Sequence, residues 1–88
     1  MNEKVLKLFL KEKRMKIFLH VKEEEYATKI RDKALCMYSY VVSTLKNFEK
    51  LGLVESKREG RVKKYTLTKK GEKIDKKLRE LVEITGKS

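Results

Sequence analysis

The sequence predicts a single α+β domain, residues 1–88, that is mostly helical and has one two-stranded hairpin and a long C-terminal helix. Three observations support this. Val41, Leu45 and Phe48 repeat at i, i+4 and i+7, the spacing of a helix with one buried face. Two segments that read as strands, 54–58 and 61–67, flank Glu59-Gly60, a turn signal. Apolar residues then recur at helical spacing from residue 74 onward.

The first twenty residues carry two apolar patterns that do not share one helical face. Val5, Leu6 and Phe9 form one cluster, with Asn2 as an expected N-cap, and a second cluster lies on another side at Met15, Phe18 and Leu19. We expect a break near residues 10–13 and a helix end near Val21. The acidic run 23–25 suits the N-terminus of a next helix over 24–33, where the helix dipole favours negative charge.

A short connection at 34–37 leads to the helix over 38–51, and Gly52 stands where a left-handed cap is expected. The strands over 54–58 and 61–67 are expected to pair through a turn at residues 59–60, which sets Val54 opposite Tyr65 and Arg58 opposite Arg61. Thr68 is the expected N-cap of the last helix, over 69–85.

The composition points to a polyanionic partner. The 88 residues include 24 Lys and Arg against 13 Asp and Glu, a formal net charge of +11. Such a balance favours nucleic acid or an anionic membrane surface. A heat-adapted surface rich in Lys and Glu is the alternative, consistent with the lack of Gln and Pro.

We expect an intracellular protein with no membrane segment, because the longest apolar run, residues 34–38, is far short of the ~18 residues that a spanning helix needs. A single Cys36 allows no intramolecular disulfide; packing is its expected role, and a bridge between subunits is the alternative.

The helix over 38–51 has a polar face opposite its apolar one. Its hydroxyl, amide and cationic groups are those that hydrogen-bond base edges and phosphates in DNA. The alternative is a plain solvated face. The candidate contact residues are Tyr38, Ser39, Tyr40, Ser43, Lys46 and Asn47.

The hairpin concentrates positive charge. Residues 57–64 hold five cations and one acid, a net of +4, while the other 80 residues share +7. Cations that face one another across two strands repel, and a phosphate between them would reverse that. The alternative is a soluble loop tip. The candidate phosphate contacts are Lys57, Arg58, Arg61, Lys63 and Lys64.

The last helix has a narrow apolar stripe, which is typical of a seam between two helices. We expect residues 1–11 and 69–88 to pair with a second copy, although contact between the two ends of one chain is the alternative. The candidate interface residues are Val5, Leu6, Phe9, Ile74, Leu78, Leu81 and Val82, continued by Thr85.

Residues 45–74 resemble the winged helix-turn-helix of MarR-like and related archaeal regulators. Those proteins combine a leucine-rich helix, a Leu-Glu-x-x-Gly-Leu-Val motif, a basic wing and Leu-Thr-x-x-Gly. Residues 48–54 (FEKLGLV) and 67–71 (LTKKG) match the two motifs, with Phe48 in place of leucine. One departure is that residues 34–37 lack the glycine often found in the helix–helix turn.

The resemblance implies a homodimer that binds double-stranded DNA, with the helix over 38–51 in the major groove. It also implies that the wing at 57–64 follows the backbone or minor groove and that the terminal helices form the dimer interface. We expect a sequence-specific transcriptional regulator, a repressor, without a cofactor and, since the chain is short, without a small-molecule effector.

This hypothesis has three alternatives: an enzyme, a metal-binding regulator, and a winged helix with another role. An enzyme is not expected, because the single His20 lies in an apolar helical pattern and no catalytic set stands out. A metal site is not expected, because one Cys and one His do not supply the usual three or four ligands. The stronger alternative is a winged helix that coats DNA nonspecifically or docks a protein.

Overall fold

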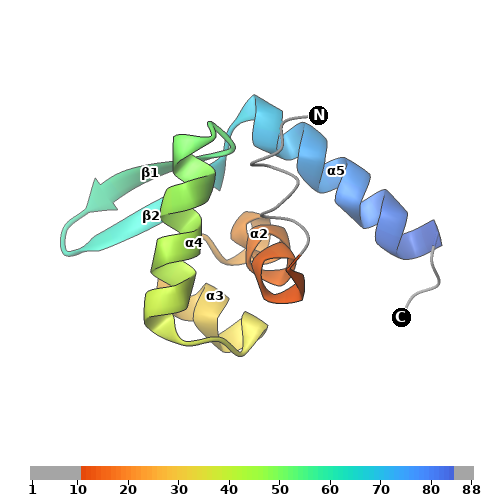
Figure 1. Cartoon of the computed structure of the whole chain (residues 1–88). Helices are drawn as coiled ribbons and strands as arrows, with labels where there is room; N and C mark the ends of the chain where they lie inside the picture. The colour runs from red at the N-terminus through yellow and green to blue at the C-terminus, as the bar shows by residue number, and fades with distance from the viewer. Residues whose placement is uncertain (1–10, 85–88) are drawn as a thin grey trace.

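The computed structural model describes residues 11–84, and Figure 1 shows their arrangement. Three helices, a two-stranded antiparallel sheet and a long last helix follow one another, so the α+β, mostly helical prediction is confirmed. The elements are α2 (Glu12–Glu24), α3 (Ala27–Ala34), α4 (Tyr38–Lys50), β1 (Val54–Glu59), β2 (Val62–Leu67) and α5 (Lys69–Ile84). The expected N-cap Asn2, the N-terminal apolar residues Val5, Leu6 and Phe9, and Thr85 lie outside the described residues.

The core lies where α2, α3 and α4 meet the base of the hairpin. Phe18 of α2 and Phe48 of α4 meet edge to face, with ring centroids 5.1 Å apart. The predicted inward row of α4 is confirmed, because its three residues are fully buried. In α2 the sequence placed Met15 and Leu19 beside Phe18, but these two are only half-buried. The core consists of Ile17, Phe18, Val21, Ala27, Ile30, Ala34, Val41, Leu45, Phe48, Leu53, Val54 and Tyr65.

The acidic run does not begin a helix, contrary to the sequence prediction. Helix α2 continues through Glu24, and Glu25 adopts a left-handed conformation (φ 56°) whose N–H donates to the Val21 carbonyl. Carboxylates at a helix C-terminus oppose the dipole. Basic groups offset this, since Glu23 lies 4.0 Å from Arg79 and Glu24 lies 4.0 Å from Lys33.

The turn between α3 and α4 contains no glycine, and a leucine takes its left-handed position. Leu35 caps α3 in the left-handed region (φ 58°), a conformation that costs a non-glycine residue roughly 1 kcal/mol or more. Its N–H and that of Cys36 both donate to the Arg31 carbonyl, which closes the turn. The turn is therefore hydrogen-bonded without glycine.

The end of α4 follows the prediction. Gly52 has φ 77°, its N–H donates to Glu49, and the Leu53 N–H donates to Phe48 across 3.0 Å. This pair of bonds is the Schellman motif, which directs the chain into β1.

The hairpin differs from the predicted one in register. The turn is Gly60-Arg61, and the strands pair Val54 with Leu67 and Arg58 with Lys63. Gly60 supplies the positive φ of 63° that the tight turn requires. The prediction of Val54 opposite Tyr65 and of Arg58 opposite Arg61 was therefore wrong by two residues. Because side chains alternate with period two, the shift leaves Val54 and Tyr65 on the same, buried face.

Thr68 caps α5 as predicted. Its Oγ1 accepts the Gly71 N–H at 3.0 Å and donates to the Gly52 carbonyl at 2.6 Å, so it joins both ends of the hairpin to the helix. From there α5 passes α2 and extends beyond it toward the C-terminus (Figure 1). A buried Asp75 binds Arg79 Nε at 3.0 Å, and Arg79 also donates to the Leu19 carbonyl of α2 at 2.6 Å.

Candidate nucleic-acid interface

The outward face of α4 borders a shallow surface hollow, which we call the outer hollow. Five of the six predicted contact residues on this helix line it, and the exception is Tyr40, which is half-buried and packs against the core. The reason is angular, since Tyr40 stands between the buried row and the exposed face of α4. Two further residues line the hollow: Val42, which was not predicted, and Lys50, which the sequence places on the same polar face. The lining residues are Tyr38, Ser39, Val42, Ser43, Lys46, Asn47 and Lys50.

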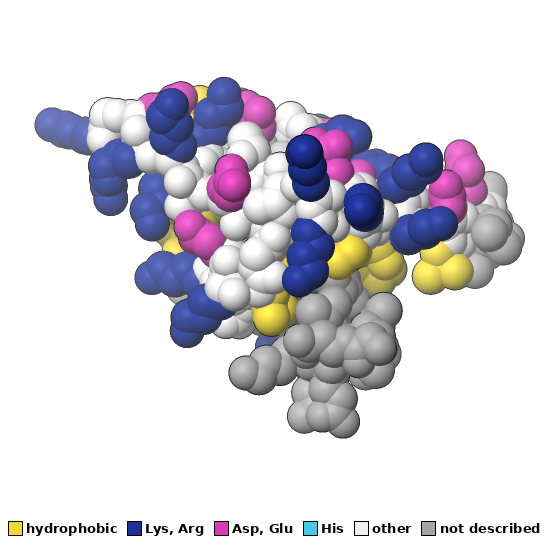
Figure 2. Space-filling view, turned by 90° about the horizontal axis from the view of Figure 1, so that it is seen from above, with side chains coloured by type: hydrophobic (Ala, Val, Ile, Leu, Met, Phe, Trp, Pro, Cys, Tyr) yellow, Lys and Arg dark blue, Asp and Glu magenta, His cyan; other side chains and the backbone are white. Residues whose placement is uncertain are grey.

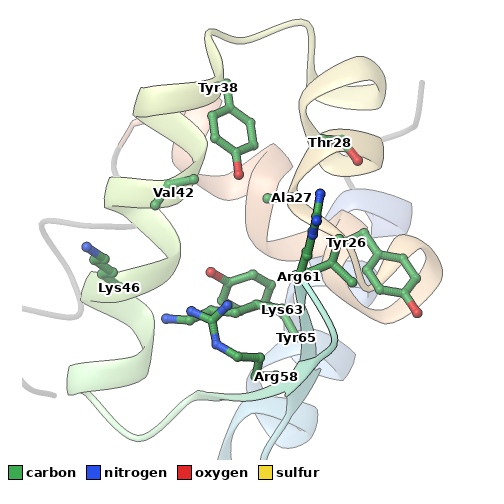
Figure 3. A pocket seen from close by; sticks show the side chains of 11 residues that line it. Tyr26, Ala27, Thr28, Tyr38, Val42, Lys46, Arg58, Arg61, Lys63 and Tyr65 are labelled. Carbon is green, nitrogen blue, oxygen red and sulfur yellow. The ribbon is translucent and has the colours of Figure 1, made fainter.

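A second hollow, the wing groove, separates α4 from the hairpin and has a volume of about 530 Å³. Figure 3 shows Arg58 and Lys63 extending from the strands toward α4, with Arg61 on the opposite wall near Tyr26 and Ala27. Tyr38, Val42 and Lys46 form the α4 side of the groove. Residues far apart in the sequence thus form one concave surface.

Both hollows are positively charged. Five cations line them, and among residues 11–84 no Asp or Glu does so. Figure 2 shows the same tendency on a wider scale, with Lys and Arg side chains gathered along the hairpin end of the molecule. The five cations are Lys46, Lys50, Arg58, Arg61 and Lys63.

The carboxylates closest in sequence to these cations are bound to other groups. Glu49 accepts a hydrogen bond from the Ser56 hydroxyl at 2.8 Å. Glu59 accepts one from the Tyr26 hydroxyl at 3.3 Å. Each of these acids accepts a hydrogen bond from a hydroxyl group and lines neither hollow, so the cations of the hollows keep their charge available for an anion.

The predicted hairpin cations fall into two groups. Arg58, Arg61 and Lys63 line the wing groove, whereas Lys57 and Lys64 line neither hollow. Lys64 instead forms an ion pair with Glu25, with Nζ 3.5 Å from Oε1. The structure therefore brings three of the five predicted cations together with α4.

The hairpin is fixed to the α2–α3 connection, a contact that the sequence analysis missed. Tyr26 makes an isolated antiparallel bridge with Lys64, and the Tyr65 N–H donates to the Glu25 carbonyl at 2.7 Å. The only sequence signal was an aromatic residue after an acidic run, which is too weak to identify a strand. The bridge fixes the position of the hairpin relative to α3 and α4.

Tyr65 forms the floor of the wing groove. Figure 3 shows its ring lying across the groove with the hydroxyl toward α4. Burial raises the pKa of Tyr65 above its ordinary value of 10.0, and the nearby Glu49 and Tyr38 raise it further. The phenol therefore stays protonated at neutral pH. It adds a hydrogen-bond donor to the groove and no negative charge.

The apolar stripe of α5 is divided between two environments. Ile74 and Leu78 pack against the core of their own chain, so this half of the stripe is not a free seam. Leu81 and Val82 lie farther along, with 53% and 41% of their surface exposed. The expected partners Val5, Leu6 and Phe9 lie outside the described residues.

No helix within residues 11–84 combines the length and apolarity needed to cross a bilayer. The same residues contain no cluster of three or more His, Cys, Asp or Glu side chains suited to hold a metal ion. His20 is half-buried on α2, with Nδ1 3.5 Å from Glu23 Oε1.

No protein-family model matches the chain. An uncharacterised protein of Archaeoglobus fulgidus is 33% identical over 96% of this chain and 95% of its own length. The crystal structure of AF1382 from the same organism superimposes with a TM-score of 0.83 at 32% identity, over 96% of this chain and 99% of that one.

More distant structures share the fold. FabT of Streptococcus pneumoniae, solved in complex with DNA, has a TM-score of 0.74 at 22% identity over 84% of this chain and 55% of that one. The homodimeric winged helix-turn-helix DNA-binding domain of Mb0332 from Mycobacterium bovis, a possible ArsR-family regulator, has a TM-score of 0.68 at 22% identity over 93% and 74%. The chain therefore belongs to the family of the A. fulgidus protein and has the winged helix-turn-helix fold of transcriptional regulators.

Proposed function

We propose that this protein is a transcriptional regulator that binds a specific double-stranded DNA sequence as a homodimer. Helix α4 enters the major groove, and the wing, the β1–β2 hairpin, contacts the neighbouring backbone or minor groove. By blocking access to its site the dimer acts as a repressor. The observation that supports this best is the pair of joined hollows, which are lined by five cations and, within residues 11–84, by no carboxylate.

The chemistry of the two hollows is suited to the two parts of a DNA site. Ser39, Ser43 and Asn47 offer donors and acceptors to base edges in the outer hollow. Arg58, Arg61 and Lys63 offer charge to phosphates from the wing groove. Phosphate contacts set the position of the protein on the duplex, and base contacts select the sequence.

Dimerisation is supported by α5. Its 16 residues extend over roughly 24 Å at 1.5 Å per residue, and its outer half exposes Leu81 and Val82. A two-fold pair of recognition helices contacts half-sites about one helical turn apart, roughly 34 Å, so the bound DNA should be a pseudo-palindrome. The homodimeric Mb0332 domain is a precedent within the fold.

A second candidate is a protein that coats DNA without sequence preference. It is favoured by the composition of the hollows, which hold five cations but a single amide, Asn47. Nonspecific binding draws its free energy from phosphate charge alone.

Selection of bound duplexes from a random-sequence library, followed by competition titrations, tests the proposal. A specific regulator should prefer its selected pseudo-palindrome over random duplex by ~10³-fold or more at physiological salt. Equal affinity for all duplexes would favour the coating protein. Absence of duplex binding would leave only a protein-interaction role.

A further inference from the structure

The exposed face of α4 has an apolar ridge that the proposed function does not explain. Tyr38, Val42 and Lys46 follow one another at four-residue intervals, so they form a row along the helix. All three line both the wing groove and the outer hollow. A residue that borders both hollows lies between them. These three side chains therefore form the ridge between the two hollows.

Two of the three ridge side chains present hydrocarbon to a partner. Val42 is aliphatic and half-buried, and Tyr38 has 49% of its surface exposed. One side of Val42 packs against the core, and the rest of its side chain lines both hollows. A valine at this position has no hydrogen bond to offer a base. Its partner must present an apolar group.

The surroundings of the ridge restrict what that apolar group is. Lys46 ends the ridge, and Arg58 and Lys63 face it across the wing groove. The partner must therefore combine an apolar group with negative charge on either side of it. In the major groove of DNA, thymine presents a 5-methyl group between two phosphate backbones, and the other three bases carry no methyl group there.

We propose that Val42, together with Tyr38, contacts thymine methyl groups, so that each DNA half-site has at least one thymine facing the ridge. This inference rests on the proposed function and adds the base that α4 selects. The hydroxyl and amide groups of Ser43 and Asn47 recognise positions to one side of this thymine. Lys46 recognises a guanine edge or a phosphate beyond it.

Replacing thymine with uracil tests the inference, because uracil lacks only the methyl group. The probe is the duplex selected from a random library by the full chain, with each thymine of a half-site replaced in turn. At one position the wild-type protein should lose about fourfold in affinity, the factor that corresponds to ~0.8 kcal/mol for one buried CH₂. Replacement in both half-sites should multiply the loss to about 16-fold.

A double-mutant cycle assigns the effect to Val42. Val42→Ala should bind the thymine and uracil duplexes almost equally, with its folding checked by circular dichroism. The matched control is Leu35→Ala, which removes an 84% exposed apolar side chain that lines neither hollow and should keep the fourfold ratio.

The outcomes separate the inference from the proposed function. If no duplex is selected, the proposed function fails. If a duplex is selected but uracil binds as well as thymine at every position, the methyl contact is refuted while the proposed function stands. Persistence of the ratio in Val42→Ala would also overturn the inference.

Discussion

Replacing Lys63 with alanine should weaken DNA binding much more than replacing its neighbour Lys64. Lys63 lines the wing groove beside α4, whereas Lys64 lines neither hollow and lies 3.5 Å from Glu25. In a homodimer Lys63→Ala removes two phosphate contacts. The slope of log K against log salt should therefore become shallower by ~1.8, at ~0.9 for each phosphate. If the affinities converge near 1 M salt, this is a loss of ~30-fold at 0.15 M.

Lys64→Ala is the matched control, since it removes the same side chain one residue away. Its slope should stay close to that of the wild type. The cost should fall on stability instead, and by less than ~1 kcal/mol, because the ion pair with Glu25 is about one-third exposed on both sides. Fluorescence anisotropy at five salt concentrations, with the same duplex, measures both slopes. Equal changes in slope for the two variants would refute the assignment of Lys63 to the wing groove and of Lys64 to the ion pair with Glu25.

Three further perturbations test the fold and the assembly. Gly71→Ala should destabilise the domain by ~1–3 kcal/mol in chemical denaturation, since an added Cβ would clash with the Leu53 carbonyl oxygen. The control Lys70→Ala, at an exposed position one residue earlier, should change stability little. A Gly71→Ala variant as stable as the wild type would mean that α5 packs differently. Arg79→Ala should lower the free energy of unfolding by ~1–3 kcal/mol, because it leaves the buried Asp75 without its partner. Adding Asp75→Asn to the same chain should recover part of that loss. Absence of any recovery would contradict the pairing of the two side chains. Leu81→Glu combined with Val82→Glu should convert the dimer to a monomer in sedimentation, since both side chains are exposed on the outer half of α5. Lys73→Gln with Lys76→Gln, an equal change in net charge on the other side of α5, should leave the protein dimeric. A dimer that survives both pairs of changes would place the interface elsewhere.

Features set by neighbours along the chain were predictable. The inward row of α4 follows from the 3.6-residue period of a helix. Gly52 ends α4 and Thr68 begins α5, and both do so through bonds with residues that are close in sequence or adjacent at the base of the hairpin. The polar face of α4 was identified for the same reason, since opposite sides of a helix are fixed once the buried side is known. Tyr40 was misassigned because it stands at the boundary between the two sides.

Features set by distant contacts were not predictable. Both Glu59-Gly60 and Gly60-Arg61 are acceptable turns, and the observed register goes with the hydrogen bond from Tyr65 to Glu25. The acidic run was assigned to the wrong helix because its partners, Arg79 and Lys33, lie on other elements. Local charge patterns do not show which cation meets which carboxylate.

The sequence by itself determined the order of the helices and strands, the buried face of α4, the caps at Gly52 and Thr68 and the excess of positive charge, because each depends on local periodicity or composition. Only the tertiary structure decided which cations face α4, that Lys64 braces the wing and that Val42 stands on a ridge between two hollows. The physical reason is that a side chain's role depends on what long-range packing brings beside it. Lys63 and Lys64 are chemically identical, and the alternation of a β-strand turns them in opposite directions.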